Sequence, residues 1–130
     1  MKAVRVTNAS RGTILADRAW VADICLSRLR GLLGRRGLAP GEGLLLTPCR
    51  GIHTFGMRFP IDALYIAGNG RVILACTLMR PNRWGPWVRA ATCVLELPAG
   101  TVMATATTAG DRLAVSAVQA DPHARDPLSH

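Results

Sequence analysis

Side chains that can do chemistry gather in residues 49–62. Within these fourteen residues lie a thiol, an imidazole, two guanidinium groups and a carboxylate. They belong to Cys49, His53, Arg50, Arg58 and Asp62. A thiol beside an imidazole can act as a nucleophile and its base, and an imidazole beside a carboxylate can act as an acid/base pair. The guanidinium groups can bind an anion through paired hydrogen bonds.

Other interpretations of this segment stay open. His53 and Asp62 are metal-ligand types, but no third ligand accompanies them, and we predict neither a metal site nor a cofactor. No oxyanion-hole motif accompanies Cys49. A buried hydrogen-bond network of His53, Arg58 and Asp62 with a purely structural role needs the fewest assumptions.

Two carboxylates and a methionine extend the candidate site. Glu96 interrupts the apolar run 93–97, and Asp111 follows Gly110, where a turn-capping role is common. Met57 shares a strand-like alternation with His53 and Phe55. We predict one open pocket for a small, possibly anionic ligand, lined by His53, Met57, Arg58, Asp62, Glu96 and Asp111.

A second candidate surface lies in residues 80–89, a stretch rich in proline and glycine that we predict to be a loop. Trp84 and Trp87 flank Gly85-Pro86 there. Exposed tryptophans can bind a protein partner or stack on a base, although they more often cover a small core.

The elements that must position these residues are mostly strands, because apolar residues alternate with a period of two. A hairpin around Gly68-Asn69-Gly70 is the clearest signal. The predicted strands are Ala3–Val6, Gly12–Ala16, Gly43–Thr47, Ile61–Ala67, Arg71–Cys76, Thr92–Leu97, Thr101–Ala106 and Arg112–Val118.

One segment has helical spacing. Leu26, Leu29 and Leu33 recur at helical intervals, with Asp23 as an N-cap and a glycine after the last leucine. Together these patterns predict an α+β, mainly β fold: a small antiparallel β-barrel-like domain with one short packed α-helix. The predicted domain is 1–118, followed by a flexible tail, 119–130.

The 130 residues are 49% hydrophobic, which excludes wholesale disorder and fits one domain. The four cysteines are scattered without a CxxC pair, so a reducing compartment is expected. No apolar run approaches the ~20 residues of a membrane helix, and no export signal is recognised. We therefore predict a cytoplasmic protein with no membrane association.

The basic excess has two interpretations. Sixteen Lys and Arg residues oppose eight Asp and Glu, for a net charge of +8, and Lys2 is the one lysine. Such an excess is typical of nucleic-acid binding. However, the arginines form no run longer than Arg35-Arg36, so nucleic acid is not the favoured partner.

Five motifs occur in order along the chain: Leu29–Arg35, IHTFGMRFPID, GNGRVI, VLELPAG and GDRL. As a series they resemble the bacterial and archaeal domain-of-unknown-function family numbered one hundred and ninety-two, over roughly Thr13–Val118. The resemblance implies a small β-barrel-like domain with a packed helix and no established activity. The residues that it marks are Arg30, Gly31, His53, Met57, Arg58, Asp62, Glu96, Gly100, Gly110 and Asp111.

The sequence thus favours a domain that binds a small ligand or a protein partner and is not an enzyme. A hydrolase or transferase with His53 and Asp62 as acid and base is one alternative. Nucleic-acid binding through surface arginines is the other.

Overall fold

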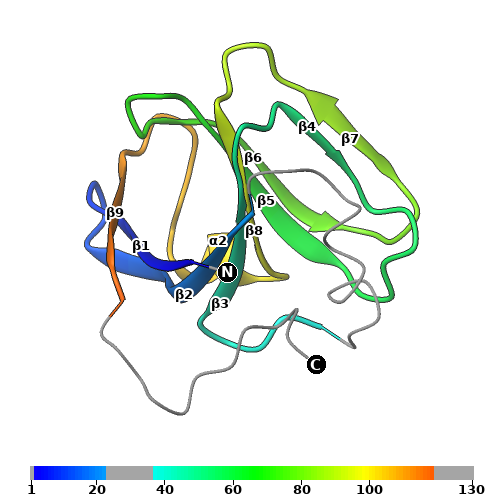
Figure 1. Cartoon of the computed structure of the whole chain (residues 1–130), viewed down its shortest axis with the longest axis horizontal. Coiled ribbons are helices and arrows are strands. Elements are labelled where there is room, and N and C mark those ends of the chain that lie inside the picture. The colour runs from blue at the N-terminus through cyan, green and yellow to red at the C-terminus, as the bar shows by residue number, and fades with distance from the viewer. Residues whose placement is uncertain (1, 23–36, 119–130) are drawn as a thin grey trace.

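The computed structural model describes residues 2–22 and 37–118. The predicted helix around Leu26–Leu33 and the predicted tail 119–130 lie outside these described residues. Within them the chain is built almost entirely from strands (Figure 1). The strands are β1 (Ala3–Asn8), β2 (Thr13–Ala22), β3 (Glu42–Leu46), β4 (Gly51–His53), β5 (Ile61–Ile66), β6 (Val72–Met79), β7 (Trp84–Trp87), β8 (Cys93–Pro98) and β9 (Leu113–Ala117).

Seven strands form one sheet in the order β6-β5-β8-β3-β2-β1-β9. Neighbours are antiparallel except β2 and β3, which are parallel. The sheet curls so far that its two edges approach, and an isolated bridge joins Arg71 and Arg112 beside β6 and β9. This strongly curled half-barrel confirms the predicted mainly β class.

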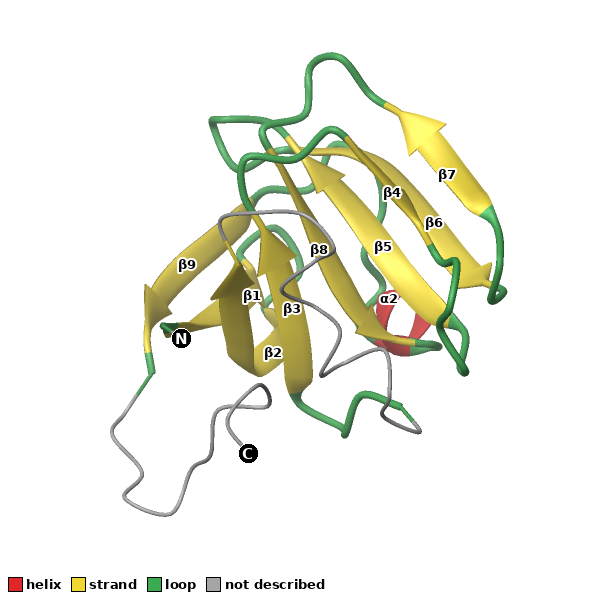
Figure 2. Ribbon diagram, turned by 45° about the vertical axis from the view of Figure 1, so that its right-hand side comes forward, coloured by secondary structure: helices red, strands yellow, loops and turns green. Residues whose placement is uncertain are grey.

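The second sheet has two strands, β4 and β7, and it lies beside β5 and β6 (Figure 2). Apolar residues on the two faces of the large sheet form two separate cores. Tyr65 and Val94 belong to the core on the side of the small sheet, whereas Leu64 and Leu95 belong to the other core. All six residues of β5 are buried because both of its faces are covered.

Seven of the eight predicted strands are confirmed, with ends shifted by a few residues. The strand predicted at Thr101–Ala106 is wrong, because Thr101–Ala104 forms the short helix α2. The loop predicted for residues 80–89 is wrong in part, because Trp84–Trp87 forms β7. Pro86 is compatible with that strand because a two-stranded sheet leaves one edge of each strand unpaired.

The side chain of Asp62 stabilises the start of helix α2. Its carboxylate is fully buried and accepts hydrogen bonds from the backbone N–H groups of Gly100 (3.0 Å) and Val102 (2.9 Å), at the start of the helix. A third bond, from the N–H of Leu78 (2.9 Å), lies where the pairing of β5 with β6 shifts register. Asp62 therefore satisfies three backbone donors that the sheet leaves free.

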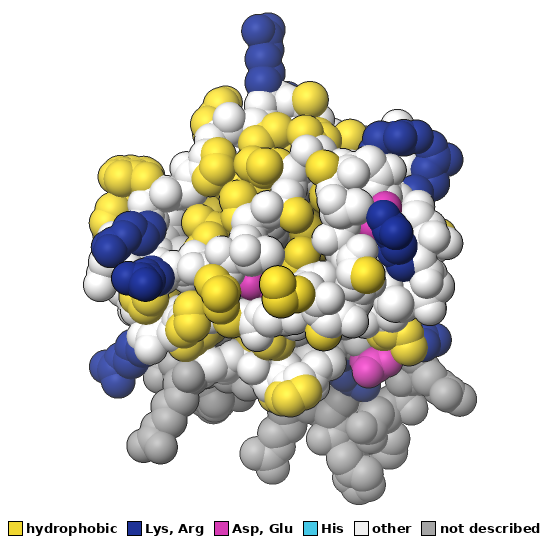
Figure 3. Space-filling view, turned by 180° about the vertical axis from the view of Figure 1, so that it is seen from behind, with side chains coloured by type: hydrophobic (Ala, Val, Ile, Leu, Met, Phe, Trp, Pro, Cys, Tyr) yellow, Lys and Arg dark blue, Asp and Glu magenta, His cyan; other side chains and the backbone are white. Residues whose placement is uncertain are grey.

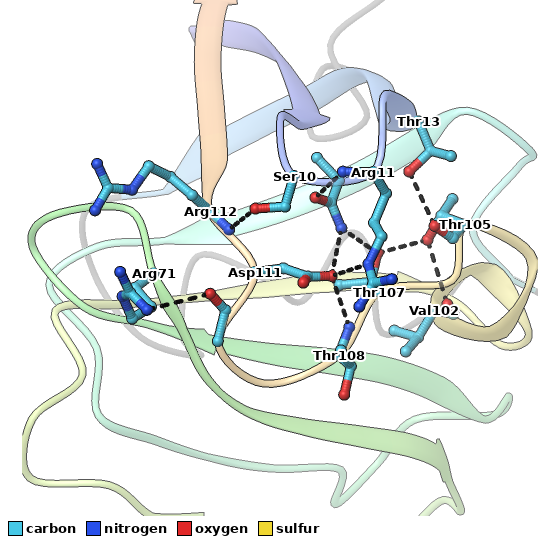
Figure 4. Close-up of polar contacts among 12 residues, drawn as sticks. Ser10, Arg11, Thr13, Arg71, Val102, Thr105, Thr107, Thr108, Asp111 and Arg112 are labelled. Atoms are coloured by element: carbon cyan, nitrogen blue, oxygen red, sulfur yellow. Dashed lines mark hydrogen bonds and ion pairs between the residues drawn. The ribbon is translucent and has the colours of Figure 1, made fainter.

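Asp111 stabilises the segment between α2 and β9 (Figure 4). Its carboxylate accepts hydrogen bonds from the Asn8 side chain (3.0 Å), from Nε of Arg11 (3.1 Å) and from the N–H of Thr108 (3.0 Å). The bond from Asn8, followed by that from Arg11, lowers the pKa of Asp111 below its usual range. The network ties the end of β1 to the segment that precedes β9, which is a structural role.

Candidate functional site

A pocket of about 230 Å³ opens between the small sheet and the large one. Ile52 and His53 of β4 form one wall, and Trp84 and Trp87 of β7 form another. Its lining is almost entirely apolar. Among the described residues that line it, Glu96 of β8 is the one acidic side chain, and none is a lysine or an arginine.

The register of the large sheet places Glu96 in this pocket. Glu96 pairs with Leu44 of β3 on one side and with Ala63 of β5 on the other. It alternates with Leu95 and Leu97, which belong to the other core, so it shares the face of Val94. The small side chain of Ala63 leaves space beside the carboxylate.

The Glu96 carboxylate is buried without a hydrogen-bonding partner. The residue is 6% exposed, and its side chain makes no hydrogen bond or ion pair with any described residue. Burial raises the pKa of Glu96 to about 7, because the apolar surroundings disfavour the charged form. Buried polar groups are normally paired, so an unpaired carboxylate facing a cavity is unusual.

His53 belongs to an aromatic cluster at the rim. Its Nδ1 accepts a hydrogen bond from the N–H of Phe55 (3.2 Å). The ring centroids of His53 and Trp84 lie 5.7 Å apart, and those of Phe55 and Trp84 lie 5.0 Å apart, both edge to face. These contacts fix the Trp84 ring although 78% of the residue is exposed.

The hydroxyl of Tyr65 attaches β7 to the large sheet. Tyr65 is fully buried, and its O–H donates to the backbone oxygen of Pro86 at 2.8 Å. Burial is the main reason that the pKa of Tyr65 is raised to about 12, so the group keeps its proton. The backbone of Gly85 passes so close that an added Cβ would lie 3.0 Å from the Tyr65 oxygen. Glycine is therefore needed at position 85.

Replacing Tyr65 with phenylalanine tests this attachment. We expect the free energy of unfolding to fall by about 1–2 kcal/mol, because the buried carbonyl of Pro86 loses its donor. Amide hydrogen exchange should accelerate in β7 more than in β8. Uniform exchange in the two strands would show that Tyr65 does not hold β7. The matched control is Thr13→Val, which also removes one hydroxyl donor to a backbone carbonyl, that of Thr105.

The structure brings together two of the six predicted ligand-binding side chains, His53 and Glu96. Asp62 lies on the opposite face of β5 from the pocket, with α2, so it forms no acid/base pair with His53. Asp111 belongs to the network near β9, with β3, β2 and β1 between it and β8. Met57 packs in the core on the pocket side.

Arg58 is placed apart from its predicted neighbours. It is exposed and makes no hydrogen bond or ion pair with the described residues. The predicted structural network of His53, Arg58 and Asp62 is therefore not formed. Trp84 and Trp87, the predicted partner surface, are 78% and 72% exposed and also line the pocket.

Sequence reasoning missed Tyr65 and Pro86 as elements of the site. A tyrosine within a mainly apolar strand is a usable signal, because its hydroxyl requires an acceptor when it is buried. In the described ranges, no three His, Cys, Asp or Glu side chains converge on a point that could hold a metal ion. Within these ranges there is also no helix with the length and apolar character needed to cross a bilayer.

Two solved structures are similar to this chain over most of their length. One is a candidate transcription regulator from Sinorhizobium meliloti 1021, with 29% identity and a TM-score of 0.72, covering 88% of this chain and 92% of its own. The other is a protein of unknown function from Novosphingobium aromaticivorans DSM 12444, with 20% identity and a TM-score of 0.71. That match covers 86% of this chain and 83% of the other, and it supports the fold alone.

No curated protein matches the chain. The family model of DUF192, described as Uncharacterized ACR, matches residues 6–115. This range includes every strand that contributes to the pocket. The resemblance of the five motifs is thereby confirmed: the chain belongs to the DUF192 family.

Proposed function

We propose that this domain binds a small, mainly apolar molecule that carries a positive charge, with Glu96 as the counter-ion. The observation that carries the proposal is the buried Glu96 side chain, which faces an apolar pocket and has no hydrogen-bond or ion-pair partner among the described residues. A protonated amine would supply both the missing hydrogen bond and the missing charge. The apolar walls would hold the hydrocarbon part of the ligand.

The two tryptophans favour a cation over other polar ligands. An indole ring attracts a cation that lies over its face, and Trp84 and Trp87 both line the pocket. Glu96 and these two rings would therefore both attract a positively charged group. An anionic ligand, which the arginines of residues 49–62 suggested, is disfavoured because neither of these arginines lines this pocket and because Glu96 would repel it.

The other hypotheses have weaker support. The hydrolase or transferase hypothesis needs His53 beside Asp62, and these side chains lie on different faces of the sheet. The Sinorhizobium meliloti protein is described as a candidate transcription regulator, which would agree with nucleic-acid binding. On the face in Figure 3, however, Lys and Arg side chains project at separate points around a hydrophobic area. A cytoplasmic location remains a prediction from the cysteine spacing.

Three probes of matched size test the proposal: n-pentylamine, 1-pentanol and hexanoate, each titrated into labelled protein at pH 8 and followed by NMR. We expect the amine to bind at least tenfold more tightly than the alcohol, and hexanoate to bind more weakly than either. The shifts should be concentrated in the amides of β4 and β7. Between pH 8 and pH 6 the affinity for the amine should fall about tenfold, because Glu96 becomes protonated.

Glu96→Gln is the decisive variant because it keeps the size of the side chain and removes its charge. It should bind pentylamine and pentanol equally, within about twofold. The control is Asp17→Asn, which neutralises a carboxylate that is exposed and does not line the pocket. Equal affinity of the wild type for amine and alcohol would overturn the proposal. Tighter binding of the neutral probe at low pH would also overturn it. That result would indicate that protonated Glu96 donates a hydrogen bond to a neutral ligand.

A further inference from the structure

A second hollow adjoins the Glu96 pocket. Its volume is about 420 Å³, and it is lined by residues of the segment 48–51, by Trp87 and by the turn at Ala91 and Thr92. Cys49, Gly51 and Trp87 line both spaces. The two hollows therefore lie side by side and share these three residues as part of their walls.

Among the described residues that line the second hollow, Arg50 is the one with a charged side chain. It is exposed, and its guanidinium makes no hydrogen bond or ion pair with the described residues. The backbone of Arg50 is nevertheless fixed, because its oxygen accepts a hydrogen bond from the N–H of Val88 at 2.8 Å. An anchored backbone with an unengaged guanidinium is suited to bind a carboxylate from outside.

Glycine at position 51 is required for this arrangement. A Cβ there would lie 2.7 Å from an atom of the Trp87 ring, so the ring rests directly on the backbone of β4. The ring can therefore form a wall of both hollows at once. A ligand that occupies both would have an apolar middle part against Trp87, with a carboxylate of the protein at one end and a guanidinium at the other.

We infer that the two hollows together bind a small zwitterion whose ammonium group and carboxylate are separated by a flexible apolar chain. The ammonium end lies against Glu96 and the carboxylate end against Arg50. This inference rests on the proposed function, because it keeps Glu96 as the site of the cation. The inference adds a negative charge on the ligand and a preferred distance between its two charged groups. The first pocket alone specifies neither.

An ω-amino acid series tests the inference. The probes are 4-aminobutyrate, 5-aminovalerate and 6-aminohexanoate, compared with n-pentylamine, which is 6-aminohexanoate without its carboxylate. We expect one chain length to bind about three- to fivefold more tightly than pentylamine, the gain typical of one exposed ion pair. The gain should disappear in Arg50→Gln, whereas the affinity of this variant for pentylamine should stay within twofold of wild type.

The variants separate failure of this inference from failure of the proposed function. Glu96→Gln should weaken binding of both pentylamine and the preferred ω-amino acid. If Glu96→Gln weakens both but Arg50→Gln weakens neither, the zwitterion is wrong and the cation site stands. If Glu96→Gln leaves pentylamine binding unchanged, the proposed function itself is wrong. Arg58→Gln is the matched control, since Arg58 is also an exposed arginine without a described partner and lines neither hollow.

Discussion

Replacing Asp62 with alanine is expected to lower the free energy of unfolding by about 3–5 kcal/mol. The carboxylate is fully buried and accepts hydrogen bonds from the N–H groups of Leu78, Gly100 and Val102. Alanine would leave three donors without an acceptor in a place that water does not reach. Chemical denaturation gives the loss of stability, and amide hydrogen exchange at these three residues shows where the structure opens.

A second variant keeps the Asp62 prediction testable if the alanine variant does not fold. A domain of this size has a total stability of about 5–15 kcal/mol, so a loss of this size threatens folding. Asp62→Asn retains one carbonyl acceptor, and we expect it to fold with a smaller loss. Asp17→Ala, which truncates an exposed aspartate, should change the stability by less than about 0.5 kcal/mol. A loss below about 1 kcal/mol in Asp62→Ala would contradict the structural role.

The same interactions explain why one strand prediction failed. The order Thr-Val-Met-Ala-Thr-Ala in residues 101–106 alternates like a strand. The helix forms there because Asp62, some forty residues earlier in the chain, accepts hydrogen bonds from its first N–H groups. Such a partner is invisible to any pattern within the segment. The other strands were predictable because their alternation and their turns are local.

The small sheet was missed for a related reason. Gly85-Pro86 between two tryptophans has the composition of a loop. What makes Trp84–Trp87 a strand is its pairing with Gly51–His53 and the hydroxyl of Tyr65 that holds the Pro86 carbonyl. Both partners are remote in sequence. The pocket exists because of this sheet, so its walls could not be predicted without the long-range pairing.

The candidate site was predictable in its residue types more than in its geometry. Glu96 was recognisable as a charge within an apolar run, and the sequence left open whether it faces solvent or the interior. The register with Leu44 and Ala63 decides that it faces the pocket. Asp62 and Asp111 were recognisable as unusual carboxylates too, but backbone and side-chain donors satisfy both of them. A carboxylate that stands out in a sequence can therefore have a structural or a functional role. The presence of hydrogen-bond donors around it in the structure distinguishes the two roles.

Replacing Glu96 with glutamine is expected to stabilise the protein at alkaline pH and not at acid pH. The folded-state pKa of Glu96 is about 7, against 4.5 for the ordinary group. Below pH 4.5 the group is protonated in both states and costs nothing. As the pH rises from 4.5 to 7, the unfolded chain loses this proton while the folded protein keeps it, so stability is lost over this range. The difference of about 2.5 pKa units corresponds to about 3 kcal/mol above pH 8.

The measurement is the free energy of unfolding of wild type and Glu96→Gln between pH 4 and pH 9. Their difference should rise from near zero to about 3 kcal/mol in favour of the variant, with most of the change between pH 4.5 and pH 7. Comparing the two proteins removes the contribution of Asp111. Because the pKa of Asp111 is lowered in the folded protein, its charged form stabilises the fold above the ordinary titration range of aspartate. This stability is lost in acid. The effect is the same in wild type and in Glu96→Gln.

Other titratable groups near Glu96 do not produce this profile. His53 lines the same pocket, and Cys49 and Cys76 lie close to Tyr65, but all three are also present in the variant. Asp17→Asn should follow the wild-type profile, because that carboxylate is exposed. Two results would contradict this prediction: a stability difference that does not vary with pH, or a variant that is less stable than wild type at pH 8. Either would mean that interactions within the free protein already stabilise the Glu96 charge, so that no ligand is needed to explain a glutamate at this position.

The expected gain in stability on removing Glu96 connects the fold to the proposed function. A carboxylate that costs the free protein about 3 kcal/mol at alkaline pH contributes nothing to folding there, so its benefit must lie elsewhere. A cationic ligand would recover that cost by pairing with the charge. In the presence of saturating pentylamine, the stability advantage of Glu96→Gln at pH 8 should therefore shrink, because the ligand stabilises only the wild type strongly. If pentylamine leaves the stability advantage of Glu96→Gln at pH 8 unchanged, the destabilising effect of Glu96 is unrelated to cation binding.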